Sequence, residues 1–220
     1  MNQLTHTDFL RGEVHRAKRE QELQAFQYPA AALYTGLQHQ YVMQGLRTLR
    51  HRQPQLTVDL FILSAAYGLV PEQKVLTPYE LTFNGMGRKK LAQWATTLRI
   101  LDEANRLVAQ YDLVFFLLGD VYLQALNLPL QSRENQTFVV LGGQTHHTAW
   151  IQHNARTEII PLNNTEAQAF SCGVISLKGF LFGKLAAIAA QEPEVLSGWA
   201  KEPSLIRLEL EAFKQPKGAY

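Results

Sequence analysis

The chain has 220 residues, of which 46% are apolar and 18% are charged, so it can build a sizeable folded core. A formal net charge of +2 permits an anionic partner without requiring one. The single cysteine, Cys172, excludes an intrachain disulfide and a zinc site built from several cysteines. The first residues are polar and the apolar stretches are too short to span a bilayer. We therefore expect a cytoplasmic protein without membrane contact.

The chain divides into three predicted parts: a polar N-terminal segment over residues 1–27, an α/β domain over 28–191 and a helical C-terminal tail over 192–220. Residues 11–27 of the N-terminal segment are expected to form a loop or an exposed helix. Apolar periodicity predicts helices, with Pro29 in the first turn of the first one and Asn164 or Thr165 capping a later one. Taken in chain order, the predicted elements begin with a helix from Pro29 to about 51–54, a strand over 58–63, a long and mostly loop segment over 64–87, and a helix over 88–110. A strand over 112–118, a short helix opening at 119–120, strands over 137–141 and 157–162, and helices over 175–191 and 204–213 follow.

The predicted strands are short, almost wholly apolar, and alternate with helices. This pattern favours a mostly parallel sheet with helices on both faces, which is a three-layer α/β fold. Ligands of such sheets bind outside the carboxyl ends of the strands. The loops of interest are therefore 64–87, 119–122 and 142–150.

The first candidate site follows the strand over 58–63. Ser64 ends this strand, and Gly68 lets the backbone approach a ligand closely. Tyr67 and Tyr79 are suited to stacking on a base or donating hydrogen bonds, and Glu80 is suited to acid or base chemistry. An equally weighted interpretation is a structural loop that the two tyrosines anchor.

Two further residues, Tyr34 and Asp120, are candidates for ligand binding, but for each of them the residue types alone favour a purely structural role. Tyr34, in Leu33-Tyr34-Thr35-Gly36, could contribute to an anion site at a helix turn, but core packing within a helix is the preferred interpretation. Asp120 follows the strand over 112–118, with Tyr122 two residues later, and capping of the next helix is its default role.

Histidines and basic residues supply the remaining candidates. His146, His147 and His153 match no metal-binding spacing, so no metal and no cofactor are expected. Basic residues cluster in three places, which are phosphate-binding candidates or ordinary solvated helix faces: His15–Arg19, Arg47–Arg52 and Arg88-Lys89-Lys90.

Three ordered segments resemble the YaaA-like peroxide-stress proteins and a related, poorly characterised bacterial and phage domain family. The central one is Ile62–Pro71, which contains Ser-Ala-Ala-Tyr-Gly-Leu-Val, followed by Pro78-Tyr79-Glu80. Tyr28–Gly36 is similar to the upstream Pro-Ala-x-x-Leu-Tyr-Thr-Gly element, and Gly119–Tyr122 is similar to a later Gly-x-x-Tyr element.

The resemblance implies a fold distantly like that of uracil-DNA glycosylases, association with DNA, and handling of a nucleobase. One departure is that relatives begin with a strand ending in a Cys-Ser or similar pair and then a lysine. Here Glu13–Arg19 occupies that region without a cysteine, and Lys18 is the residue that would keep the basic role.

We therefore predict a nucleic-acid-binding protein that recognises a nucleobase, with DNA N-glycosylase activity as its possible chemistry. Ser64, Tyr67, Gly68, Tyr79, Tyr34 and Tyr122 are the predicted pocket residues, Glu80 and Asp120 the acid–base candidates, and Lys18, Arg88, Lys89 and Lys90 the phosphate-binding candidates. Two alternatives stay open. One is a non-catalytic DNA-binding module of a stress response, and the other is an N-glycosidase acting on a free nucleotide or nucleoside. The sequence leaves the oligomeric state open.

Overall fold

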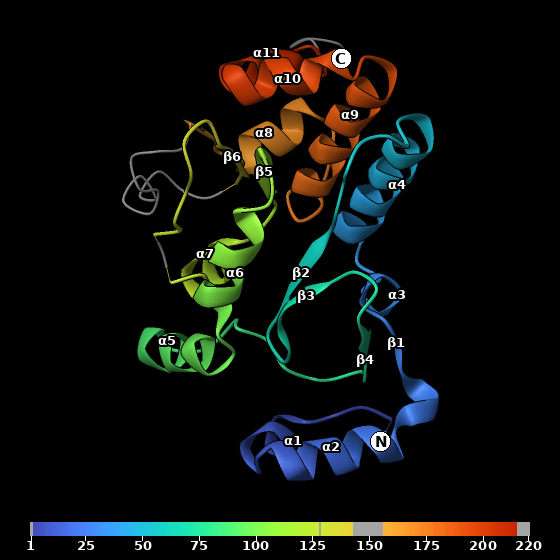
Figure 1. Ribbon diagram of the computed structural model, residues 1–220, viewed down its shortest axis with the longest axis vertical. Coiled ribbons are helices and arrows are strands. Elements are labelled where there is room, and N and C mark those ends of the chain that lie inside the picture. Colours follow the sequence, from blue (N-terminus) through green and yellow to red (C-terminus); the bar gives the residue numbers. More distant parts are fainter. Residues whose placement is uncertain (1, 128, 143–155, 215–220) are drawn as a thin grey trace. The chain divides into compact units, whose positions relative to one another are not determined.

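The computed structural model describes residues 2–127, 129–142 and 156–214, and it is a mixed α/β structure (Figure 1). Its chain folds into two compact units, each built from segments that are distant in sequence. Unit 1 comprises Met1–Thr35 and Asp59–Ile100, and unit 2 comprises Gly36–Val58 and Leu101–Tyr220.

Unit 1 contains small antiparallel sheets and short helices. Its elements are α1 (His6–Leu10), α2 (Glu13–Glu22), the 3-10 helix η1 (Gln24–Phe26), β1 (Tyr28–Pro29), α3 (Ala30–Leu33), β2 (Phe61–Ser64), β3 (Gly68–Pro71), β4 (Val75–Leu76) and α5 (Arg88–Thr97). Strand β1 pairs with β4, and β2 pairs with β3. Helix α2 confirms the exposed-helix interpretation over Glu13–Glu22, since none of its residues is buried, whereas α1 buries Asp8 and Phe9.

A tight hairpin joins β2 to β3. Ser64 pairs with Gly68, so three residues make the connection, and Gly68 adopts φ 72°. A glycine in this left-handed conformation is typical of three-residue hairpin loops. The strand expected over 58–63 is thus present as β2, but its partner is the antiparallel β3. The prediction of a long loop over 64–87 is wrong where β3 and β4 form, because pairing supplies backbone hydrogen bonds that local sequence does not reveal.

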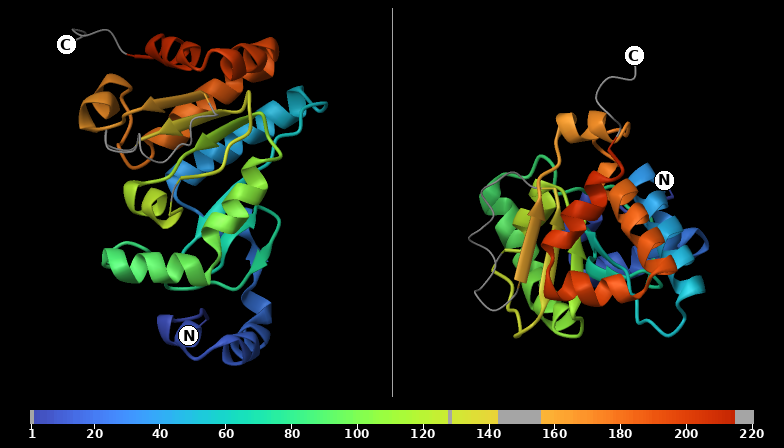
Figure 2. Two further views of the ribbon diagram at one scale, coloured as in Figure 1. Left: turned by 60° about the vertical axis from the view of Figure 1, so that its left-hand side comes forward. Right: turned by 90° about the horizontal axis from the view of Figure 1, so that it is seen from above.

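Unit 2 contains a parallel sheet and longer helices. Its elements are α4 (Leu37–Arg52), α6 (Ile100–Val108, whose first residue belongs to unit 1), β5 (Leu113–Phe116), α7 (Asp120–Ala125), β6 (Thr137–Leu141), β7 (Arg156–Ile160), α8 (Asn164–Ala169), α9 (Leu177–Gln191), α10 (Glu194–Lys201) and α11 (Ser204–Glu211). The sheet order is β5-β6-β7, and both pairings are parallel (Figure 2).

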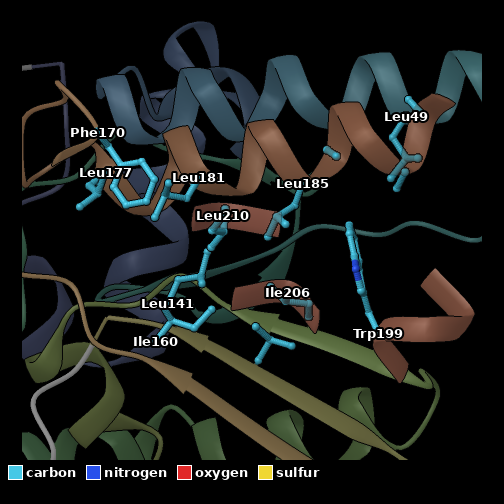
Figure 3. Close-up of a cluster of buried hydrophobic side chains, with 14 of the residues drawn as sticks. Leu49, Leu141, Ile160, Phe170, Leu177, Leu181, Leu185, Trp199, Ile206 and Leu210 are labelled. Atoms are coloured by element: carbon cyan, nitrogen blue, oxygen red, sulfur yellow. The ribbon is translucent and has the colours of Figure 1, made fainter. Parts of the chain in front are cut away.

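The core of unit 2 lies between this sheet and helices α4, α9, α10 and α11. All five residues of β6 are buried, which means that both faces of the central strand are covered. Figure 3 shows Leu141 and Ile160 of the sheet facing Leu181 and Leu210 across this core. Helices α4 and α9 approach closely at Gly179, where a Cβ would overlap the backbone oxygen of Gln38.

Two predicted helices are interrupted in the structure. The helix expected from Pro29 to about 51–54 breaks at Tyr34–Gly36 into α3 and α4, and Pro29 lies in β1 rather than in a helical turn. The helix expected over 88–110 breaks at Arg99, which adopts φ 51° and divides α5 from α6. Both breaks coincide with the boundary between units, where the chain changes the core against which it packs. Apolar periodicity continues across such a boundary, so it conceals the break.

The N-cap of α8 lies one residue before the predicted position. Helix α8 is capped by Asn163, whose side-chain oxygen accepts from the N–H of Thr165 at 2.6 Å, so the prediction of Asn164 or Thr165 as the cap is wrong. Within the described ranges, every helix is too short or too polar to cross a bilayer.

Candidate functional site

A chain of three hydroxyl groups joins two of the motif segments inside unit 1. Ser64, at the end of β2, donates its Oγ–H to the hydroxyl of Tyr79 at 2.8 Å. The hydroxyl of Tyr79 lies 2.7 Å from that of Tyr34, 45 residues away in sequence. Either of the two tyrosine hydroxyl groups can be the donor of this contact. The predicted pocket residues Ser64, Tyr79 and Tyr34 therefore share one hydrogen-bonded network.

The hairpin loop holds Ser64 in place. Its Oγ accepts the backbone N–H groups of Ala66 at 3.2 Å and Tyr67 at 3.1 Å, as a serine does when its side chain closes a turn. Ser64 is only 1% exposed. Its hydroxyl is consequently a buried anchor of the network, and the half-buried Tyr34 and Tyr79 are the members that reach the surface.

The tyrosine rings form an aromatic cluster with Phe9 of α1. Phe9, Tyr67 and Tyr79 pack edge to face, with centroid separations of 5.6 to 6.4 Å. Edge-to-face packing is a favoured geometry for aromatic pairs and stabilises the core in which it occurs. The anchoring interpretation of the two tyrosines thus describes part of their role, because the rings fill a core while the hydroxyl groups make directed polar contacts.

A carboxylate that the sequence did not single out lies beside Tyr67. Burial raises the pKa of Tyr67, and the negative charge of Glu20 on α2 raises it further. The Tyr67 hydroxyl also donates to the backbone oxygen of Thr77 at 3.3 Å. Glu20 Oε1 is buried and has no hydrogen-bond partner among the described residues, with Arg16 Nε 3.6 Å away. The only sequence signal for this carboxylate was its i, i+4 spacing from Arg16.

A second polar group on α1 and α2 was also missed. Asp8 is 8% exposed and accepts from the N–H and the hydroxyl of Thr5, both at 2.8 Å. His15 Nε2 lies 2.9 Å from Asp8 Oδ1, and Arg19 Nε lies 3.8 Å from the same oxygen. The backbone hydrogen bond from Thr5, followed by contacts with His15 and Arg19, lowers the pKa of Asp8 to about 2. The Thr5-x-x-Asp8 spacing is the signal that could have located it.

The predicted phosphate-binding residues of unit 1 are exposed. Arg88, Lys89 and Lys90 form the first turn of α5, which begins after the N-cap Gly87. None of the three has an ion-pair partner in the part of unit 1 that the structure describes. Lys18 is exposed on α2. The N-terminus of a helix is itself partly positive, so three cations there concentrate positive potential at one point.

The two acid–base candidates belong to different units. Glu80 lies in unit 1, is exposed, and accepts a hydrogen bond from Gln3 Nε2 at 3.2 Å. Asp120 lies in unit 2 as the first residue of α7. Gly119 occupies the N-cap position and Asp120 makes no capping hydrogen bond, so its default interpretation as a helix cap is wrong. Tyr122 is half-buried on α7, also in unit 2.

A pocket of about 180 Å³ lies in unit 2, beyond the end of β7. Its charged lining is internally paired: Arg207 binds Glu158, Lys214 binds Glu211, and Glu166 completes the capping box of Asn163. These side chains need no ligand to balance their charges. His146, His147 and His153, considered above as metal ligands, lie outside the described residues.

Comparison with known proteins yields a family without an assigned activity. The model of a family of unknown function (DUF6884) matches residues 20–153, which is more than half of the chain. The match spans the three motif segments and the hydroxyl network. Comparisons with curated proteins and with solved structures give no match.

Proposed function

We propose a nucleic-acid function for this chain, which belongs to DUF6884, a family of unknown function. Unit 1 binds the sugar–phosphate backbone and recognises a nucleobase with the hydroxyl groups at the end of its network. The observation that carries this proposal is the convergence of Ser64, Tyr79 and Tyr34, from two motif segments, on one chain of hydrogen bonds. The resemblance of the same segments to YaaA-like proteins supports it.

The charge distribution supports contact with phosphates. Unit 1 contains nine Lys and Arg against seven Asp and Glu, whereas unit 2 contains twelve of each. The net charge of +2 therefore belongs entirely to unit 1. Its exposed cations at Arg88, Lys89 and Lys90 are placed to exchange their counterions for phosphate groups, which is the main source of nonspecific affinity for DNA.

The fold supports the same proposal. We propose that the β5-β6-β7 sheet is part of a mostly parallel, three-layer fold of the kind that uracil-DNA glycosylases have. Its parallel pairing and the complete burial of β6 favour this assignment.

A second candidate function, N-glycosidic cleavage, is favoured by one observation. Glu20 places a partly buried carboxylate beside Tyr67, and its Oε1 lies 3.6 Å from Arg16 Nε. A carboxylate in such surroundings is suited to stabilising the positive charge that develops on the sugar when a glycosidic bond breaks. If the chain does not cleave the glycosidic bond, the same residues bind nucleic acid without catalysis.

Salt-dependent binding tests the nucleic-acid function. Fluorescence anisotropy with single- and double-stranded DNA, between about 50 and 200 mM salt, should show affinity that falls steeply with salt. Replacing Arg88, Lys89 and Lys90 by glutamine should reduce the slope of log K against log salt by up to about 2.7, at about 0.9 per phosphate contact. The matched control replaces three exposed cations of unit 2 that lie outside the basic clusters, Arg106, Arg133 and Lys201, by glutamine. Binding without a salt slope, or equal losses in the two triple variants, contradicts the proposal.

Base recognition is tested at Tyr34. Wild-type protein should discriminate among homopolymer oligonucleotides by about fivefold or more, and Tyr34→Phe should reduce this preference while keeping the salt slope. If Tyr34→Phe discriminates among the homopolymers as well as the wild type does, residues other than Tyr34 determine the base preference.

Cleavage is tested with DNA that carries normal, deaminated and alkylated bases, read out as alkali-sensitive abasic sites. Glu20→Gln should abolish the product and keep binding. Glu80→Gln and Asp120→Asn test the two carboxylates that the sequence suggested. Tight binding with no abasic product from any substrate identifies a binding module.

A further inference from the structure

A lysine of unit 2 lies at the edge of the parallel sheet where ligands commonly bind. Strands β5 and β6 end at Phe116 and Leu141, and parallel strands present their carboxyl ends at one edge. Lys178, the second residue of α9, reaches over the end of β6. A Cβ at Gly142 would overlap Lys178 Cε and lie 3.1 Å from Nζ. The space that Gly142 leaves is therefore occupied by this lysine, at the edge where α/β sheets hold ligands.

Among the described residues, Lys178 has no counter-ion within 4.0 Å. The side chain is half-buried, and burial lowers its pKa. The negative charge of Asp120, the first residue of α7, acts against this lowering of the pKa, yet no ion pair within 4.0 Å and no hydrogen bond joins Lys178 to any described residue. A partly desolvated cation without a partner costs free energy, and its position in the first turn of α9 adds to that cost. Charges kept at such a cost are typical of binding sites.

The other cations of this part of unit 2 have structural roles. Lys184 lies over the rings of Phe180 and Phe213, at 5.2 and 5.3 Å from their centroids. Lys214 and Arg207 are in ion pairs, as described above. Lys178 therefore differs from its neighbours, because nothing within the described ranges accounts for its charge.

We propose that Lys178 and Asp120 form a binding site for a small hydroxylated phosphate, such as a sugar phosphate or a nucleoside monophosphate. The phosphate accepts hydrogen bonds from the Lys178 ammonium and neutralises it, as phosphates do with lysine in other sites. A hydroxyl group of the ligand donates to the Asp120 carboxylate, which separates such ligands from simple anions. This site goes beyond the nucleic-acid function, and its phosphate contact depends on Lys178, which the nucleic-acid function does not use. Either proposal can therefore fail without the other.

Calorimetric titration of the full chain tests the site with three probes: ribose 5-phosphate, inorganic phosphate and glycerate. Ribose 5-phosphate should bind with a dissociation constant of about 1 mM or lower, and Lys178→Met should weaken it at least about tenfold. Asp120→Asn should weaken ribose 5-phosphate and leave inorganic phosphate unchanged or tighter, because it removes a repulsive charge. Glycerate, which has hydroxyl groups and a carboxylate but no phosphate, should bind more weakly than ribose 5-phosphate. Equal affinities for the two probes would mean that the site accepts any oxyanion and does not require a phosphate.

The control variant is Lys201→Met, which removes an exposed lysine of the same unit and should leave every affinity unchanged. The proposal is overturned if the wild-type protein binds no probe at about 10 mM, or if Lys178→Met binds as the wild type does.

The pH dependence of binding separates a ligand-binding lysine from a structural one. Lys178 holds an anion only while protonated, so affinity in the wild type should fall as pH rises from about 7 to about 10. Arginine stays protonated over this range, so Lys178→Arg should bind with little pH dependence. This conservative variant also keeps the test decisive if Lys178→Met does not fold. The same decline in Lys178→Arg would mean that another group titrates.

Discussion

Tyr79 is the central residue of the hydroxyl network, because it contacts both Ser64 and Tyr34. Replacing Tyr79 by phenylalanine keeps the ring and removes the acceptor of the Ser64 proton, so a buried hydroxyl loses its partner. We expect the free energy of unfolding to fall by about 1–3 kcal/mol in urea denaturation. Tyr28→Phe, which changes a tyrosine that is 51% exposed, should have little effect.

A double variant isolates the hydrogen bond from the packing around it. Ser64→Ala combined with Tyr79→Phe removes both ends of the contact, and its cost should be smaller than the sum of the single costs. Strict additivity would mean that Ser64 and Tyr79 do not stabilise each other.

Asp8 gives unit 1 a predictable response to acid. Its pKa is about 2 in the folded protein and 3.8 without the fold, so its contribution is fully present above about pH 4. This contribution is lost as pH falls from about 4 to about 2, and its size is at most about 2 kcal/mol. Asp8→Asn should therefore be less stable than the wild type at neutral pH and nearly equal to it near pH 2.

Urea unfolding at several pH values measures this difference, and Glu13→Gln is the control because Glu13 is an exposed carboxylate on α2. A gap between wild type and Asp8→Asn that stays constant down to pH 2 would contradict the assignment.

At the scale of elements, α4 packs against α9 with the least space at Gly179. Gly179→Ala places a Cβ against the backbone oxygen of Gln38, which can move only with its helix. We expect a loss of about 1–3 kcal/mol in the free energy of unfolding. Gly183→Ala is the matched control on the same helix, because its Cβ would lie 3.4 Å from Tyr41 O.

That control should be neutral or gain up to about 1 kcal/mol, since alanine is the better helix former. Equal losses in Gly179→Ala and Gly183→Ala would mean that the helices are less closely packed at Gly179 than the structure has them.

At the scale of the whole molecule, the two proposed sites belong to different units and should be separable. Lys178→Met should leave the salt slope of DNA binding unchanged, and the triple glutamine variant of Arg88, Lys89 and Lys90 should bind ribose 5-phosphate as the wild type does. Anisotropy and calorimetry on the same preparations measure both. Loss of both activities in either variant would show that the sites are coupled or that the variant is misfolded, which circular dichroism distinguishes.

The candidate site was only partly foreseeable. Ser64, Tyr67 and Tyr79 occur in one short motif, so sequence could group them. Tyr34 was favoured as a core residue of a helix, and the structure places it outside the helix and against Tyr79. Asp8 and Glu20 were not singled out, because a carboxylate in a polar segment resembles any solvated side chain until tertiary packing buries it.

The sequence by itself determined the α/β class and the positions of several elements, because apolar periodicity and glycine or proline signals act locally. Strand β6 occupies residues 137–141, as its apolar run predicts. Tertiary structure alone decided which strands pair, where the long helices break, and that Glu80 and Asp120 belong to separate units. These features depend on contacts between segments distant in sequence, and no local pattern of residues records which segment a strand or a carboxylate will meet.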